Sequence, residues 1–523
     1  MKGLAAIRDI GKLTLEQKVG QMILCGFEGM EPNDDAGIIR CIREFGIGGV
    51  LYRARNVRDT GQTAQLSRAL QDEARDCGQL PLWIAAELGG GALARLAEGM
   101  ALMPGVMALA AAGNKAAAYE AGLVSGRELK ALGIQLGMAP ALDPSGSPND
   151  LHVGSQGEER VGDYGAPFLR GLQDAGVVAA AGLLPGCLEP GGPGAADTLE
   201  QLAASYAQAV EAGAGVLLAP SPEAGPAAAV IGRLRGQLGD EVVIAANCAE
   251  TSGPGAPLSA LEAVEAGADL IVLTGPPAGG LAELQSLVEA VRQGRIGEER
   301  IDRSVRRLLA LKERRGVLAA DEPEAGAATL AALAQVGRLA DKEAARRISE
   351  ASITVVRDEK ALLPVSADGS IYVISVETAE HLQAYEAKQA PFTLGRALRQ
   401  LGCTVTEFLV PVQEVGRLHQ ELVRSVRYGQ QVVVATYNAA QYDASQAELI
   451  RGLMTVGKDP IVVAQCSPCD LLAFHGVSTY VAAYESRPLA LRSAAKALLG
   501  QLEATGRLPV AIGALHPAGC VGG

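Results

Sequence analysis

Side chains able to do chemistry are few in the loops where an α/β protein would place a site. Cys187, Cys248 and His152 each follow a different apolar run. Thiolate and imidazole are ligands that zinc accepts, so a Cys/His metal site or a reactive thiol is one interpretation. The competing interpretation is that both cysteines are small buried residues. Carboxylates in or beside the same loops are Glu87, Asp143, Glu158, Glu159, Glu189 and Glu250. Since most acidic side chains are solvated, we keep only Glu250 as a replacement nucleophile and Asp143 as a structural anchor.

The longest of these loops lies within residues 176–200. It begins as a buried apolar strand and passes through a turn rich in Gly and Pro, and a helix starts after Asp197 and Thr198, a good N-cap pair. A strand that feeds a long loop is where α/β folds place their chemistry. Between Ala179 and Gly194, however, the only ionisable groups are Cys187 and Glu189. The loop therefore lies where an active site is expected, but it carries few side chains that could take part in catalysis.

Composition bounds the class of protein. The chain has 523 residues, too many for one ordinary core, which favours two domains. Its net charge of −13 and the absence of a dense Lys/Arg patch argue against nucleic-acid or anionic-membrane partners. No apolar run reaches the roughly 18 residues of a membrane span, and the N-terminus lacks the pattern of a signal peptide. Nine scattered cysteines favour free thiols and a cytoplasmic location.

No cofactor is predicted. The two glycine-rich runs, at residues 89–91 and 191–194, lack the spacing of dinucleotide-binding or phosphate-binding loops. The sequence therefore gives no support to nucleotide binding.

Eight short apolar runs in the first part of the chain leave room for one helix between each pair. The expected strands are Gln21–Gly26, Gly48–Tyr52, Leu82–Ala86, Gly133–Leu142, Gly176–Ala181, Gly213–Ala219, Glu241–Ala246 and Ala266–Leu273. Their apolar residues run continuously rather than alternating, as in a parallel sheet covered on both faces. This predicts a (β/α)8 barrel, similar to a TIM barrel, over residues 1–318. A doubly wound open sheet is the alternative.

The rest of the chain is predicted to hold a second α/β domain. Residues 319–350 read as a polar linker followed by a connecting helix, and residues 351–523 as an α/β sandwich. The expected strands of this sandwich are Ile371–Val376, Thr404–Val410, Gln431–Tyr437, Pro460–Ala464 and Thr479–Ala483.

Seven motifs, in order along the chain, carry a family resemblance. In the first part they are TLEQKVGQMILCG (14–26), GIGGVLYRARNV (46–57), GIQLGMAPALD (133–143) and LEAVEAGADLIVL (261–273). In the second part they are SITVV (352–356), SPCDL (467–471) and GRLPV (506–510). Together they resemble glycoside hydrolase family 3, in particular its bacterial β-N-acetylglucosaminidase branch. The resemblance implies a barrel followed by an α/β sandwich.

The resemblance also implies a mechanism, against which the residues can be compared. Members of this branch attack the sugar with an Asp and draw the proton from a His after the fifth strand. Aligned on the motifs, the nucleophile falls on Ala246 and the proton donor on Cys187 or the irregular loop behind it. The sugar-binding positions fall on Ala86, Gly182 and Leu183. A methyl group cannot form a glycosyl ester, and loss of a general acid alone costs about 10²–10⁴-fold in rate.

Two hypotheses for function follow. In the first, the chain is a catalytically inactive homologue that acts by binding, as a regulatory or scaffolding partner of an active paralogue or another protein, or as a weak sensor of cell-wall sugars. In the second, it is a retaining N-acetylhexosaminidase, or another glycosidase of cell-wall sugar turnover, that uses a replacement carboxylate such as Glu250. Whether the chain is an enzyme stays open at this point.

Overall fold

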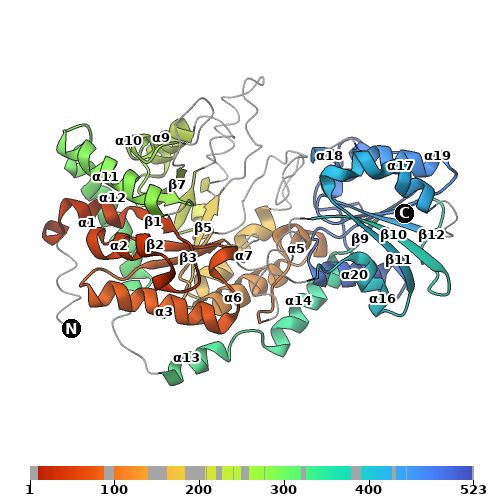
Figure 1. The fold of residues 1–523 in the computed structure, drawn as a ribbon, viewed down its shortest axis with the longest axis horizontal. Coiled ribbons are helices and arrows are strands. Elements are labelled where there is room, and N and C mark those ends of the chain that lie inside the picture. The colour runs from red at the N-terminus through yellow and green to blue at the C-terminus, as the bar shows by residue number, and fades with distance from the viewer. Residues whose placement is uncertain are drawn as a thin grey trace. The chain divides into compact units, whose positions relative to one another are not determined.

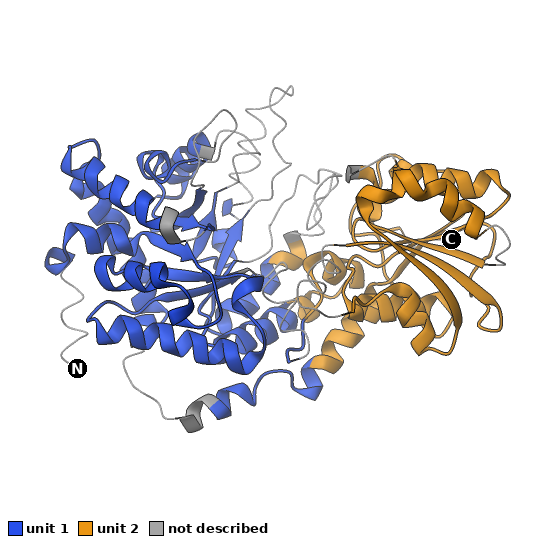
Figure 2. Cartoon of the chain, viewed as in Figure 1, with its two compact units in different colours: residues 1–102, 119–142, 166–341 blue, residues 103–118, 143–165, 342–523 orange. Residues whose placement is uncertain are grey.

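The structure is a computed structural model that describes residues 10–87, 99–138, 162–182, 206–207, 209–219, 227–239, 241–248, 258–275, 277–319, 326–378, 390–426, 431–442 and 445–520. The chain divides into two compact units, coloured separately in Figure 2. Unit 1 comprises residues 1–102, 119–142 and 166–341, and unit 2 comprises residues 103–118, 143–165 and 342–523. The domain limits predicted at residues 318 and 351 stay a prediction, since compactness alone does not define where a domain begins.

Unit 1 is built on a closed barrel of eight parallel strands, each paired with its neighbours in sequence (Figure 1). The strands are β1 (Ile23–Gly26), β2 (Gly49–Tyr52), β3 (Trp83–Glu87), β4 (Leu136–Met138), β5 (Val178–Gly182), β6 (Val216–Leu218), β7 (Val243–Cys248) and β8 (Leu270–Leu273). Pairing of β1 with β8 closes the ring, with Leu24 opposite Val272. The predicted barrel is therefore confirmed, and the alternative of an open sheet is wrong for this part of the chain.

Helices between the strands bury their apolar stripes. They are α1 (Leu15–Gln21), α2 (Ala36–Phe45), α3 (Thr60–Asp76), α6 (Lys115–Ala131), α7 (Gly162–Asp174), α9 (Ala227–Leu238), α10 (Ala260–Ala266), α11 (Pro277–Arg292) and α12 (Glu298–Arg314). A capping box is present at the start of α1, because Thr14 Oγ1 accepts from the Gln17 N–H at 3.2 Å and Gln17 Oε1 accepts from the Thr14 N–H at 3.0 Å. None of the described helices combines the length and apolar character required to cross a lipid bilayer.

The N-terminal end of the barrel holds a buried ionic network. Asp269, directly before β8, is fully buried. Its carboxylate forms ion pairs with the guanidinium groups of Arg235 and Arg307, the second at 2.8 Å. Its carboxylate also accepts from the Ser304 hydroxyl at 2.5 Å and from the Ile244 N–H at 3.1 Å. A carboxylate buried at this depth is tolerated because cations and hydrogen bonds surround it.

A second buried charge lies at the same end. The Lys312 Nζ on α12 donates to Gln21 Oε1 at 2.9 Å and to the Pro81 carbonyl at 2.6 Å, just before β1 and β3. Both acceptors are neutral, and burial lowers the pKa of Lys312 to about 7. The amine therefore loses its proton far more easily than an exposed lysine does.

The stretch predicted as one connecting helix over residues 326–349 forms two helices. These are α13 (Gly326–Leu333) and α14 (Leu339–Ser352). Gly337 between them has φ +64°, in the left-handed region that ends helices. Its N–H donates to the buried Glu128 carboxylate at 2.7 Å, which also accepts from the Ala101 N–H at 3.0 Å. A tertiary hydrogen bond thus fixes a break that the local pattern did not indicate.

Unit 2 contains a six-stranded sheet in the order β11–β10–β12–β13–β14–β9, of which only β9 is antiparallel to its neighbour. The strands are β9 (Thr354–Asp358), β10 (Ser370–Val376), β11 (Thr404–Val410), β12 (Gln431–Thr436), β13 (Ile461–Ala464) and β14 (Thr479–Ala482). The main helices are α5 (Val106–Ala112), α16 (Leu394–Gln400), α17 (Val415–Ser425), α18 (Ala439–Tyr442), α19 (Ser445–Thr455) and α20 (Pro488–Leu498).

Both faces of this sheet are covered. Val432 and Val434 belong to a core with Leu422, whereas Val433 and Ala435 pack with Leu398 on the other side. Alternating residues of one strand thus enter two separate cores, which explains the continuous apolar runs. The predicted α/β sandwich is confirmed.

Candidate functional site

The C-terminal ends of the barrel strands are where a (β/α)8 protein places its chemistry. Of the predicted site residues, the structure describes Ala86, Gly182, Ala246 and Cys248. They lie on the alternate strands β3, β5 and β7, each toward the carboxyl end, so the barrel brings them to the same edge. The remaining predicted residues, Asp143, His152, Leu183, Cys187 and Glu250, lie outside the described residues.

Ala246 lies near the end of β7, with its Cα opposite that of Ile271 in β8. It is 2 % exposed, and the residue before it, Ala245, is fully buried. Asn247 follows, half-buried and opposite Val272. An amide is a poor nucleophile, so neither Ala246 nor Asn247 offers a group able to attack an anomeric carbon.

Gly182 is the last residue of β5 and pairs with Leu218 of β6. A β-carbon built at Gly182 would lie 3.3 Å from Cβ and 3.4 Å from Cδ2 of Leu218. The space beside position 182 is therefore partly filled by an aliphatic side chain, and a long basic side chain there would have to move it.

Ala86 lies between Tyr52 of β2 and Gly137 of β4. Tyr52 is buried, and its hydroxyl pairs with the Ser67 hydroxyl at 3.0 Å on α3. Its ring stands edge-on to that of Phe27, with centroids 6.0 Å apart. Among the described residues beside Ala86, the Tyr52 hydroxyl is thus already hydrogen-bonded, to a residue of α3.

Two polar residues at this edge were not considered in the sequence analysis. Asn56 Nδ2 donates to the carbonyls of Phe27 at 3.0 Å and Gly29 at 2.9 Å. Arg55 donates to the Phe27 carbonyl at 2.9 Å and to the Thr274 carbonyl at 3.2 Å. They join the loops after β1, β2 and β8. Their signal was an Arg-Asn pair in the loop that follows a buried strand, and the hydrogen bonds give this pair a structural role.

Cys248 ends β7 and is 4 % exposed. Burial, aided by the negative charges of Glu283 and Glu262, raises the pKa of its thiol to about 12. A thiol that holds its proton so firmly is a weak nucleophile and a poor metal ligand at neutral pH. Within the described part of the chain, no group of three or more His, Cys, Asp or Glu side chains lies close enough together to hold a metal. The Cys187–Cys248–His152 site stays a prediction.

The family can now be stated. A model of the glycosyl hydrolase family 3 N-terminal domain matches residues 14–311 of the chain. The chain belongs to glycosyl hydrolase family 3. This family 3 protein is 34 % identical to a β-N-acetylglucosaminidase of known structure from Paenibacillus sp. str. FPU-7, covering 96 % of this chain and 99 % of that one with a TM-score of 0.80.

Curated relatives agree with this placement. The family 3 protein is 25 % identical to a β-N-acetylglucosaminidase/β-glucosidase of Cellulomonas fimi, over 97 % of this chain and 96 % of that protein. It is 32 % identical to β-hexosaminidase A of Pseudoalteromonas piscicida over 197 residues, which is a third of either protein's length. The chain is thus a β-hexosaminidase-like member of the family.

Proposed function

We propose that this family 3 protein is a non-catalytic homologue of the β-N-acetylhexosaminidases that acts by binding. The observation that carries the proposal is Ala246, a buried aliphatic residue in the strand end to which the family motifs assign the nucleophile. A retaining glycosidase needs a carboxylate there to form the glycosyl-enzyme bond. Without it the double displacement has no first step.

The ends of β3 and β5 support the same proposal. Gly182 and Ala86 stand where the motifs assign sugar-binding groups, neither has a polar side chain, and Leu218 partly fills the space beside Gly182. Sugar hydroxyls buried against such residues would lose their hydrogen bonds to water, at about 1–3 kcal/mol for each unsatisfied group. We therefore propose weak or no sugar binding in the barrel.

The partner in this proposal is a protein, an active paralogue being the first candidate. Nucleic acid and anionic membrane are poor candidates because the chain carries a net charge of −13. We also propose a reducing compartment such as the cytoplasm, a location in keeping with the eight described cysteines, which are all free thiols.

The second candidate function is an active retaining N-acetylhexosaminidase in cell-wall sugar turnover. The 34 % identity to the Paenibacillus enzyme favours it. It requires that a carboxylate outside the described residues, Glu250 or Asp143, replace the missing nucleophile.

Hydrolysis of a chromogenic N-acetylglucosaminide separates the two candidates, with the Paenibacillus enzyme as the positive control. We expect no turnover above buffer for the wild-type chain or for Ala246→Asp, since one carboxylate does not restore the proton donor. Wild-type turnover that is lost in Glu250→Gln or Asp143→Asn would overturn the proposal. A thermal shift with N-acetylglucosamine then tests sugar binding alone, and none is expected.

A further inference from the structure

The sheet of unit 2 has a point where its chain path reverses direction. From β10 the chain goes to β11 on one side and then returns to β12 on the other side of β10. In doubly wound sheets, ligands bind outside the carboxyl ends of the strands at such a point. The carboxyl ends of β10, β12 and β13 come together here, since Gln465, after β13, donates from Nε2 to the carbonyls of Val376 at 3.1 Å and Ala435 at 3.4 Å.

Asn438, two residues after β12, is held in an unusual backbone conformation at this edge. Its φ is +49°, in the left-handed region, and its side chain is fully buried. The Gln446 side chain binds the backbone of Tyr437, the residue before Asn438, through two hydrogen bonds. Gln446 Oε1 accepts from the Tyr437 N–H at 3.1 Å, and Gln446 Nε2 donates to the Tyr437 carbonyl at 2.9 Å. Neither amide atom of Asn438 has a hydrogen-bond partner among the described residues.

Two further buried oxygens lie at the same edge. The Nε2 of Gln465 donates to carbonyls of the sheet, whereas its Oε1 has no hydrogen-bond partner within the described chain. Asp470 accepts the Thr436 hydroxyl at 2.7 Å on Oδ2. Burial raises the pKa of this carboxyl to about 7, although the Thr436 hydroxyl and the N–H groups of Ala439 and Ala440 favour its ionised form. Its Oδ1 has no hydrogen-bond partner in the part of the chain described. All three side chains are thus tied to residues 435–440.

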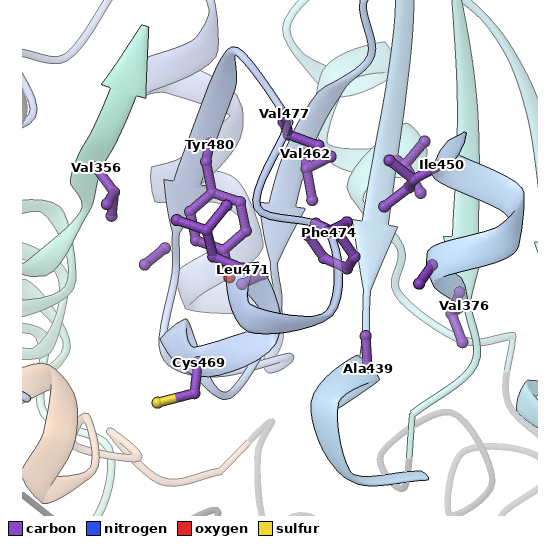
Figure 3. Packing of buried hydrophobic residues seen from close by; sticks show 14 of the residues in the cluster. Val356, Val376, Ala439, Ile450, Val462, Cys469, Leu471, Phe474, Val477 and Tyr480 are labelled. Carbon is purple, nitrogen blue, oxygen red and sulfur yellow. The ribbon is translucent and has the colours of Figure 1, made fainter. Parts of the chain in front are cut away.

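Such an arrangement is costly unless something binds to it. A buried polar atom without a partner costs about 1–3 kcal/mol, and a buried carboxylate is normally paired with a cation. No Lys, Arg or His side chain of the described chain is among the groups that act on Asp470. The surroundings are apolar, with Ala439, Leu471 and Tyr480 among the core residues nearby (Figure 3).

We propose that this edge of unit 2 binds an alkali cation through the side-chain oxygens of Asn438, Gln465 and Asp470. Three acceptor oxygens, one of them on a carboxylate, match the ligands that hard cations prefer. A single negative charge suits a monovalent rather than a divalent ion. The full burial of all three side chains admits only a small ligand. The Asn438 amide nitrogen is then left to donate to a water molecule that accompanies the ion.

The test is the thermal midpoint of the full chain in NaCl, KCl and choline chloride at equal ionic strength. Choline is too large for a closed site, so it corrects for general salt effects. We expect a saturable rise of about 2–4 °C in NaCl or KCl over choline chloride. Equal midpoints in the three salts would overturn the proposal, and so would a rise seen only with CaCl2 or MgCl2.

Variants assign the effect to this edge. Asp470→Asn keeps an acceptor for the Thr436 hydroxyl and should abolish the difference between salts. Glu407→Gln is the matched control, because Glu407 is a buried carboxylate of the same unit that already has a cation, Arg399 at 2.9 Å. It should keep the full difference.

Asn438→Gly is a second variant that tests the same site if Asp470→Asn does not fold. Glycine accepts the positive φ at no cost and removes an amide that has no partner. We expect a midpoint in choline chloride equal to or above that of the wild type, together with loss of the cation effect. A cation effect that survives both this variant and Asp470→Asn would place the ion elsewhere and refute the proposal.

Discussion

The two ends of the barrel in unit 1 are built from different kinds of residue. At the N-terminal end, Asp269 is a buried carboxylate paired with two arginines, and Lys312 is a buried amine that donates to two neutral oxygens. At the C-terminal end, Ala86, Gly182 and Ala246 lie at or near the ends of their strands, where the family motifs assign polar groups. In barrels of this kind the N-terminal end serves stability and the C-terminal end serves chemistry. The contrast supports the proposal that this protein keeps the scaffold without the chemistry.

The largest effect is expected at the N-terminal end. Asp269→Ala removes the carboxylate shared by Arg235 and Arg307 and should lower the free energy of unfolding by about 3–5 kcal/mol. Denaturant unfolding followed by circular dichroism measures it. Glu265→Ala is the control, since its pair with Arg295 is exposed and should change stability by less than about 1 kcal/mol. Equal losses in the two variants would mean that the buried network has no special role.

The second effect is a dependence on pH. The pKa of Lys312 is about 7 in the folded chain against an ordinary 10.5, so between these pH values the unfolded chain binds a proton that the folded chain has released. Stability should therefore rise with pH in this window, by up to about 1.4 kcal/mol per pH unit. Lys312→Met should remove that rise, measured as the difference in unfolding free energy from the wild type at pH 7 and pH 9. Lys360→Met, on the surface of unit 2, should keep it.

A smaller effect is expected at the start of α1, which leads into β1 at the N-terminal end. Thr14→Ala removes the hydroxyl that caps the Gln17 N–H and should cost about 1 kcal/mol. Thr14→Ser keeps the hydroxyl and should restore most of the stability in the same unfolding experiment. If Ser and Ala behave alike, the cap does not contribute.

The smallest effect is expected at the C-terminal end. Asn247→Ala changes a half-buried side chain beside Ala246 and should alter the unfolding free energy by no more than about 0.5 kcal/mol. It should also leave chromogenic hydrolysis at the level of buffer. A loss close to that of Asp269→Ala would break the contrast between the two ends and point to a polar network at the C-terminal edge.

Much of the fold could be predicted because its signals are local. Continuous apolar runs indicated all eight barrel strands. The break at Gly337 could not be predicted, since it depends on Glu128, which lies 209 residues away. The candidate site was predictable only in part. The motifs located Ala246 and Gly182, but the filling of that space by Leu218 depends on how β5 and β6 pair.

By itself, the sequence determined which residues stand near each strand end and which apolar runs form strands. Both depend on side-chain chemistry and local propensity, which each residue carries regardless of its distant neighbours. Only the tertiary structure decided that the barrel closes and that Asp269 forms ion pairs with Arg235 and Arg307. It also decided that Asn438, Gln465 and Asp470 lie at one edge of the second sheet. These arrangements join residues far apart in the chain, and their energies depend on burial and pairing, which no local pattern records.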